Sequence, residues 1–588
     1  MPPNRGLVVF SGGSAANNLV DVFEAVRKSK ECLLNYVIPI SDNGGSSSEL
    51  IRVFGGPGIG DVRSRLVRLI RPEPHSSERS AIADLFNHRL SSASSAEAHQ
   101  EWYTIVDGTS QLWRNISAAK KELIRSFFNV LNLEILKRSR PPTSTFDFTS
   151  AAVGNLFLTG ARIFCGSFES AIYLLGSICS IPDDLVRVIP AINSNFSHHI
   201  CAGLANGEII VGQNSISHPS APSAVEISVK DRLNSRLSVG DHEAEDANLP
   251  GTLPTLLKQN IKFSKTEEED LPSRIERIWY INPYGQEIHP PANPRVIDAI
   301  KSSQAIIYSI GSLYTSIIPS IILRGVGEAI RTSPARHKIL ILNGSLDREV
   351  GPSSNPYNAL DFVEAIVKAG EDSRGVPFTP DRSPTPNSRP QQPPPPPTID
   401  PSSSSTSSFL SPHPTSTPKP ATRPPRPHLY ATYITHILHL EAPCTPSVDR
   451  RLLQSKYGIE TIRLYGRKKF VVVEEEKEEE EGEGERKSSL PSSSSTNTTG
   501  EPPPRTIKSM SMTYDHQALI GAIETVLGKK GDAMVNGNGN GNGNGNGVGG
   551  DESVGGGSAG SGTGTGSGTG VGVGNWKGKP NRRNTLEA

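Results

Sequence analysis

Glycine and hydroxyl groups follow a short apolar run near the start of the chain, where they could bind a phosphate. The apolar residues 7–10 lead directly into Ser11, Gly12, Gly13 and Ser14. Glycine has no Cβ, so its backbone N–H groups can approach an anion closely. The helix expected after this turn adds unpaired N–H groups and a partial positive charge at its N-terminus. The alternative is a turn whose glycines serve only strand-to-helix packing.

A second loop rich in glycine and serine follows the apolar residues 36–40. Its candidate binding residues are Asp42, Asn43, Gly44, Gly45 and Ser46. A carboxylate is a hard oxygen ligand and a strong acceptor, so Asp42 suits Mg²⁺ or a ribose hydroxyl. Asp42 is therefore the candidate metal ligand and catalytic residue. Capping of the next helix is its alternative role.

A third glycine-rich segment, residues 55–60, precedes Asp61 and Arg63. Val62 and Leu66 indicate a helix here, which puts Arg63 in the first helical turn. The helix dipole disfavours a cation at that position, and a phosphate or carboxylate of a ligand would offset the repulsion. The alternatives are a capping role for Asp61 and an ordinary surface role for Arg63.

A fourth loop of the same kind lies much later, between the apolar residues 305–310 and an apolar stretch at 317–330 that is expected to be helical. Its candidate binding residues are Gly311, Ser312, Thr315 and Ser316. The hydroxyl groups suit phosphate oxygens, and they could also cap the helix.

These loops need a frame that brings them together. The apolar runs before them predict buried strands, and apolar positions at helical spacing, such as Leu19 and Phe23, predict the helices between strands. Parallel strands of an open α/β sheet place their C-terminal ends at one edge, where ligands bind. The sequence therefore predicts a Rossmann-like, three-layer α/β/α domain with a mostly parallel sheet and one crevice shared by the loops.

Seven segments, in this order, resemble the 2-phospho-L-lactate transferase (CofD) family and the related YvcK-type gluconeogenesis factors. They are residues 11–14, 42–48, 57–63, 152–158, 207–213, 305–322 and 339–344. The resemblance is closer to the YvcK type, and it adds Asn155 to the candidate ligand-binding residues. It also predicts a strand hairpin around residues 207–213.

The resemblance implies two functions. One is a metabolic regulator that binds a nucleotide or nucleotide-sugar. The other is a transferase that moves a phospholactyl-type group from a nucleotide-activated donor to an acceptor hydroxyl. Two departures favour binding over catalysis: Asn43 stands where the family has a second acid, and residues 309–311 lack the proline and one glycine of the family's loop. A protein-interaction scaffold with a vestigial pocket is a third alternative.

Composition changes divide the chain into a core and low-complexity tracts. The predicted core comprises residues 5–370, with a helical insert at about 75–145 and a polar loop at about 228–272. The insert is either a lid or a packed layer. Tracts rich in Pro/Ser (371–427), acidic residues and Ser (474–510) and Gly (530–588) bury too little apolar surface to fold, and we expect disorder.

Core elements are predicted to return between these tracts. A strand at 428–434, a helix at 451–457 and a strand at 459–464 lie within residues 428–473, and a final core helix lies within 511–529. The low-complexity tracts between them are then insertions in one domain. The Pro-rich insertion serves either as a linker or as a ligand for a protein partner such as an SH3 or WW module.

Charge and apolar patterning narrow the classes of partner. The 60 Lys and Arg residues balance 60 Asp and Glu residues, so no global basic field points to nucleic acid. No apolar run approaches the roughly 20 residues needed to span a bilayer, and an early strand leaves no room for a signal peptide. We expect a cytoplasmic protein whose main partner is a phosphorylated small molecule, with a homodimer as an open alternative.

Five cysteines show neither the C-x-x-C spacing of a metal site nor the density of a disulfide scaffold. His198, His199 and Cys201 lie close together in sequence, but they lack a fourth zinc ligand at suitable spacing. The sequence therefore predicts no structural zinc.

Overall fold

The computed structural model describes residues 6–13, 15–41, 44–70, 77–141, 145–217, 270–380, 427–472 and 507–528. Most of the segments expected to be disordered, and nearly all of the expected polar loop, lie outside these residues. All the described residues belong to one compact unit.

A parallel sheet forms the centre of the described residues, with the strand order β11-β10-β9-β8-β1-β2-β3. Its strands are β1 (Gly6–Phe10), β2 (Leu34–Ile38), β3 (Val186–Pro190), β8 (Ser303–Tyr308), β9 (His337–Ile341), β10 (His436–His439) and β11 (Glu460–Arg463). The central strands are almost continuously buried, as expected for a parallel sheet covered on both faces. The chain moves outward from β1 to β3 on one side and from β8 to β11 on the other.

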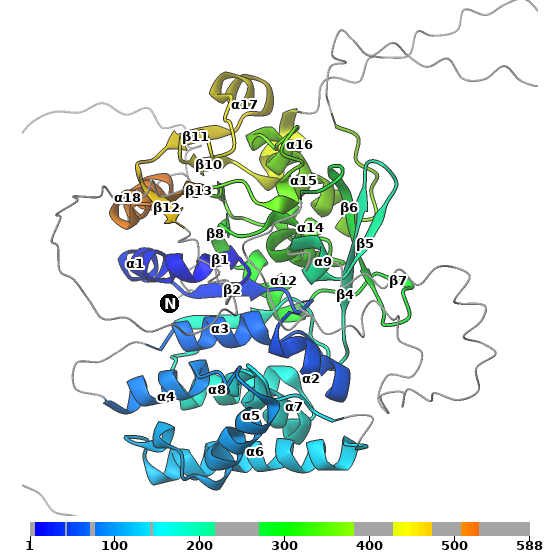
Figure 1. Ribbon diagram of the computed structural model, residues 1–588. Coiled ribbons are helices and arrows are strands. Elements are labelled where there is room, and N and C mark those ends of the chain that lie inside the picture. The colour runs from blue at the N-terminus through cyan, green and yellow to red at the C-terminus, as the bar shows by residue number, and fades with distance from the viewer. Residues whose placement is uncertain are drawn as a thin grey trace, which may run out of the picture. The chain divides into compact units, whose positions relative to one another are not determined.

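Helices cover both faces of this sheet (Figure 1). One face carries α1 (Val20–Lys30), which follows the short 3-10 helix η1 (Ala16–Leu19), together with α3 (Gly60–Arg68) and α18 (His516–Val526). The other face carries α12 (Pro294–Lys301), α14 (Val326–Thr332), α15 (Ala359–Ser373) and α16 (Pro427–Tyr433). This arrangement confirms the predicted three-layer, Rossmann-like fold.

A helical layer lies next to α3 and α2 (Ser46–Phe54), in the lower half of Figure 1. It contains α4 (Ser77–Asn87), α5 (Ser95–Asp107), α6 (Ala118–Arg138), α7 (Val153–Cys165) and α8 (Phe168–Ile178). Helix α7 is at the centre, because α4, α6 and α8 all pack against it. Gly160 permits this packing, since a Cβ there would lie only 3.1 Å from the backbone carbon of Phe127 on α6.

Two smaller antiparallel sheets complete the described structure. One has the order β5-β4-β6-β7, formed by β4 (His199–Leu204), β5 (Ile209–Val211), β6 (Ile275–Ile281) and β7 (Glu287–Ile288). Its β4–β5 turn confirms the hairpin predicted around residues 207–213. The other pairs β12 (Gly466–Val472) with β13 (Ile507–Tyr514), which the sequence did not reveal. The remaining elements are α9 (Gln213–Ser217), η3 (Leu313–Ile317), α13 (Ile318–Ile321), η4 (Arg348–Val350) and α17 (Arg450–Tyr457).

Two predictions of local structure were wrong. The strand expected at 428–434 is helix α16, and the strand β10 follows it. Tyr430, Tyr433 and Ile434 are buried at a spacing of three and four residues, which is the spacing of one helix face. The helix expected at 317–330 is interrupted between α13 and α14, where Gly325 has a φ of 95°.

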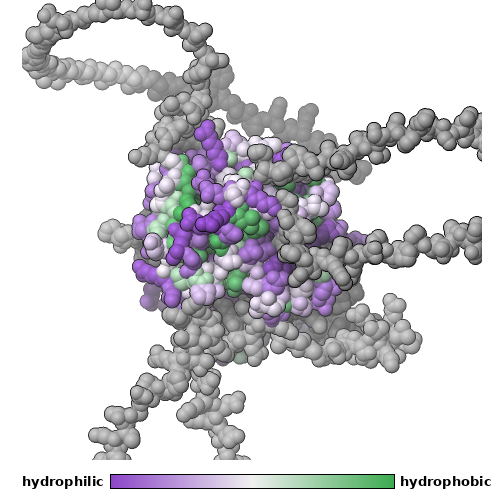
Figure 2. All heavy atoms as spheres, turned by 90° about the horizontal axis from the view of Figure 1, so that it is seen from above, coloured by the Kyte–Doolittle hydropathy of each residue, from purple (hydrophilic) through white to green (hydrophobic). Residues whose placement is uncertain are grey.

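The surface seen from above mixes hydrophilic and hydrophobic residues, so no single large apolar patch dominates the described part of that face (Figure 2). Among the helices that the structure describes, none combines the length and the apolar character needed to cross a membrane.

Candidate functional site

The strand order reverses between β1 and β8, which lie side by side in the sheet. In a doubly wound sheet, the crevice outside the C-terminal ends of the strands at this reversal is where ligands bind. β1 ends at Phe10 and β8 at Tyr308, so the first and fourth candidate loops both begin here. A cavity of about 450 Å³ opens between them.

Every candidate residue within the described part of the chain lines this cavity. They are Gly12, Gly13, Gly44, Gly45, Ser46, Asp61, Arg63, Asn155, Gly311, Ser312, Thr315 and Ser316. Ser14, Asp42 and Asn43 lie outside the described residues, so their roles stay predictions, and so does Mg²⁺ at Asp42. Across the residues that the structure does describe, no cluster of three or more His, Cys, Asp or Glu side chains could hold a metal ion.

The two glycines of the first loop allow three loops to meet. A Cβ on Gly12 would lie 2.7 Å from the Cβ of Ser316, in the fourth loop. A Cβ on Gly13 would lie 2.8 Å from the Cγ of Asp61, at the start of α3. Both distances are shorter than a van der Waals contact, so only glycine fits at these positions.

Arg65, on α3, binds the backbone of the first loop. Its side chain is fully buried, and its Nη2 donates to the carbonyl of Gly12 at 3.0 Å. Nη1 donates to the carbonyl of Ala16 at 3.4 Å, and the guanidinium lies 4.5 Å from the ring centre of Tyr36. Burial lowers the pKa of Arg65 below its usual value. These hydrogen bonds hold the carbonyl groups of Gly12 and Ala16 against the Arg65 side chain.

A chain of side-chain hydrogen bonds joins the second and third loops through α7. Asn155 donates from Nδ2 to the Ser46 hydroxyl at 3.0 Å, and its Oδ1 accepts from Arg63 Nε at 3.2 Å. Arg63 also donates to Asn87 Oδ1 at 3.2 Å. Ser46, Arg63 and Asn155 lie in the first turns of α2, α3 and α7. Three helix N-termini therefore converge on the cavity, and their dipoles favour an anion there.

The fourth loop is held by two side chains from beyond β9. Asn343 contacts both backbone groups of Gly311: its Oδ1 accepts from the N–H at 2.9 Å, and its Nδ2 donates to the carbonyl at 3.0 Å. Glu349 accepts from the backbone N–H groups of Tyr314 and Thr315 at 2.8 and 3.0 Å. The Thr315 hydroxyl lies 2.5 Å from the other oxygen of the same carboxyl group, so Glu349 holds this side chain as well as the backbone.

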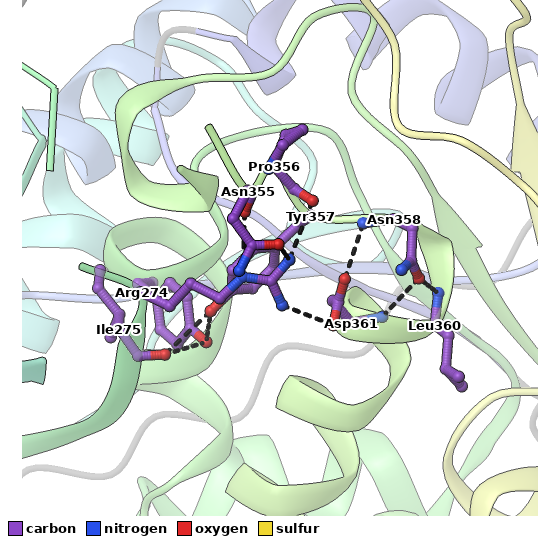
Figure 3. A network of polar contacts seen from close by, with 9 residues as sticks. Arg274, Ile275, Asn355, Pro356, Tyr357, Asn358, Leu360 and Asp361 are labelled. Carbon is purple, nitrogen blue, oxygen red and sulfur yellow. Dashed lines mark hydrogen bonds and ion pairs between the residues drawn. The ribbon is translucent and has the colours of Figure 1, made fainter. Parts of the chain in front are cut away.

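A second network supports this loop from the far side (Figure 3). Arg274 donates to Asp361, to Asn355 and to the carbonyl of Pro356, and its guanidinium lies over the ring of Tyr357. The hydroxyls of Tyr357 and Tyr314 lie 3.0 Å apart, and both donate to the carbonyl of Ile275. The start of α15 and strand β6 are thus linked to the fourth loop.

Glu349 should make the stability of the protein depend on pH. Burial and the nearby Asp347 raise the pKa of Glu349 to about 8, from 4.5. Between these two pH values only the unfolded state has lost the proton, so the free energy of unfolding should fall as the pH rises and level off above about 8. Glu349→Gln should lack this fall in urea denaturation series. Glu122→Gln, at an exposed ion pair on α6, should keep it. Equal slopes in wild type and Glu349→Gln would contradict this assignment.

Three important residues were not predicted from the sequence. Arg89 lines the cavity and, with Arg63, gives it two guanidinium groups against the carboxylate of Asp61. Arg65 could have been suspected, because it lies on the buried face of α3 with Val62 and Leu66. Nothing in the local sequence marks Arg89 or Glu349, whose roles depend on distant partners.

Comparison with known proteins gives a matching family model and several relatives. The family model described as "2-phospho-L-lactate transferase CofD" matches residues 7–380. An uncharacterized protein of Saccharomyces cerevisiae is 44% identical over 379 residues, which cover 61% of this chain and 82% of the relative. A gluconeogenesis factor of Bacillus subtilis is 22% identical over 360 residues, which cover 61% of this chain and 73% of the relative.

A solved structure of a Bacillus halodurans protein covers 80% of this chain and 94% of its own, at 18% identity and a TM-score of 0.43. The family model spans well over half of the 588 residues. The chain therefore belongs to the CofD family, and its bacterial relatives include proteins named gluconeogenesis factors.

Proposed function

We propose that this protein binds a nucleotide or nucleotide-sugar and acts as a metabolic regulator of the gluconeogenesis-factor type. One observation carries the proposal: loops from four separate parts of the chain line one cavity at the reversal point of the sheet. Its volume of about 450 Å³ lies within the range of small-molecule sites. Glycine backbone, hydroxyls, helix N-termini and two arginines are the groups that suit a diphosphate.

A transferase is the second candidate, and the description of the matched family model supports it. Such an enzyme would use the same groups to position a diphosphate and stabilise its charge. It would also need a metal ligand, for which Asp42 is the candidate.

Thermal unfolding with GDP, GTP and UDP-sugars, with and without Mg²⁺, tests both candidates. A ligand at 100 times its Kd adds about 2.7 kcal/mol to the free energy of unfolding. Stabilisation without Mg²⁺ supports the regulator, and stabilisation that requires Mg²⁺ supports the transferase. Asp42→Ala should retain affinity in the first case and lose the Mg²⁺ dependence in the second. No shift with any nucleotide would contradict both.

Arg63→Ala should weaken binding of whichever nucleotide gives the shift. A charge-assisted hydrogen bond contributes about 1.5–3 kcal/mol, so we expect a loss of roughly 10- to 150-fold in calorimetric affinity. Arg451→Ala, on the exposed side of α17, is the control and should bind as the wild type does. Arg63→Lys should recover part of the affinity, because it keeps the charge but not the planar fork. Unchanged affinity in Arg63→Ala would place the ligand elsewhere.

A further inference from the structure

A second and larger cavity, of about 870 Å³, adjoins the candidate site. Ala15, Ile310, Gly311 and Ser312 line both cavities. The loops that follow β1 and β8 therefore form the partition between the two.

One wall of the larger cavity is the β12–β13 hairpin, which lies outside the residues matched by the family model. The hairpin is fixed in place by backbone contacts at the end of β9. Met512 N–H donates to the carbonyl of Gly344 at 2.8 Å, and a Cβ on Gly344 would lie 2.8 Å from the Met512 carbonyl carbon. The close approach thus requires the glycine.

Tyr514 anchors the same hairpin to the sheet. Its hydroxyl is buried between β9 and β10, at 2.7 Å from the carbonyl of Leu342 and 3.2 Å from that of Leu438. These hydrogen bonds anchor the hairpin at the C-terminal edge of the sheet.

The hairpin contributes two cations to the cavity. Arg467 and Lys469 line it, whereas Lys468 does not, because successive side chains of a strand point to opposite faces. Arg467 lies 4.0 Å from Asp515, at the limit of an ion pair, and both side chains are exposed. The backbone of Lys469 pairs with Ser511 in the sheet, but its side chain makes no hydrogen bond or ion pair with another residue that the structure describes.

The remaining lining adds Arg68, the last residue of α3, and Asp347. Arg68 is already paired with Asp21 at 2.6 Å. Among the Lys and Arg residues that line the cavity, Lys469 and the weakly paired Arg467 are therefore the ones available to bind a ligand. Both belong to strand β12.

We propose that the larger cavity is a second subsite, which takes an anionic group, a carboxylate or a phosphate, at the far end of the ligand held in the smaller cavity. This inference rests on the proposed function, because the nucleotide's diphosphate in the smaller cavity directs the rest of the ligand across the partition. The β12 strand then determines which nucleotides the protein prefers.

Matched pairs of nucleotides test the proposal by calorimetry on the full chain. UDP-glucose and UDP-glucuronate differ by one carboxylate, as do GDP-mannose and GDP-mannuronate, and NAD and NADP differ by one phosphate. We expect the wild type to bind the more anionic member of at least one pair about tenfold more tightly. A preference within the sugar pairs identifies a carboxylate, and a preference for NADP identifies a phosphate. Added salt should weaken the preference.

The variant Arg467→Ala/Lys469→Ala should remove this preference and leave the affinity for the less anionic member unchanged. Lys468→Ala is the matched control and should keep the preference. Equal binding within every pair, or a preference that survives the double substitution, would overturn the subsite while leaving the proposed function standing. Failure of every nucleotide to bind the wild type would overturn both.

Discussion

Replacing Gly13 by alanine should abolish nucleotide binding and destabilise the protein. The new Cβ would lie 2.8 Å from Asp61 Cγ and 3.3 Å from Asp61 Cα, so a side-chain rotation alone cannot relieve the overlap. The first loop and α3 must move apart, and this separates two walls of the smaller cavity. Overpacking of this kind typically costs about 1–3 kcal/mol. Denaturant unfolding and calorimetric titration measure the two effects.

Gly176→Ala is the matched control for this substitution. Gly176 lies inside α8, and a Cβ there would meet no atom within 4 Å. Alanine should therefore stabilise this helix by about 0.5–1 kcal/mol, with binding unchanged. A Gly13→Ala protein with wild-type stability and affinity would show that the first loop does not contact Asp61 as described.

Replacing Arg65 by methionine should lower the free energy of unfolding by about 2–3 kcal/mol and weaken nucleotide binding. Methionine fills a similar volume, but it leaves the buried carbonyls of Gly12 and Ala16 without their donor. An unpaired buried acceptor costs about 1–3 kcal/mol. Removal of a desolvated charge offsets part of that loss.

Arg68→Met, one turn later on α3, is the control for this substitution. It also removes a cation, but from the surface, so it shows how much of the effect of Arg65→Met comes from burial. Arg68 pairs with Asp21 at the surface, and such pairs contribute about 0–1 kcal/mol. Its stability should therefore stay close to that of the wild type. If Arg65→Met matches Arg68→Met in denaturant unfolding, then Arg65 does not support the loop.

The candidate loops could be predicted because their signal is local. An apolar run, glycines and hydroxyls stand next to one another in the chain, and a parallel sheet needs no other information to align its C-terminal ends. This is why Gly12, Ser46 and Gly311 are found around one cavity. The prediction of a strand at 428–434 was wrong because it also used only local sequence. A short apolar segment with aromatic residues fits the period of a helix and that of a strand, and its packing against the rest of the protein determines which one forms.

The supports of the site could not be predicted, because each depends on a contact between remote residues. Arg65 is 53 residues from Gly12, and Glu349 is 34 residues from Thr315. A buried arginine or glutamate reads as a surface residue in the sequence, because its charge gives no sign of its partner. Strands β12 and β13 pair although a tract of low complexity separates them in the sequence, so no short turn motif predicts the hairpin.

Helix α1, near the start of the chain, packs against α18, which is translated much later. Lys30, at the end of α1, donates from Nζ to the carbonyls of Glu524 and Gly528, near the end of the described chain. Leu519 and Ile523 of α18 are fully buried. A ribosome must therefore translate nearly 500 further codons after α1 before its covering helix exists. Until then the first-made face of the sheet stays incomplete, and nascent chains that stop early expose apolar surface that finished molecules bury.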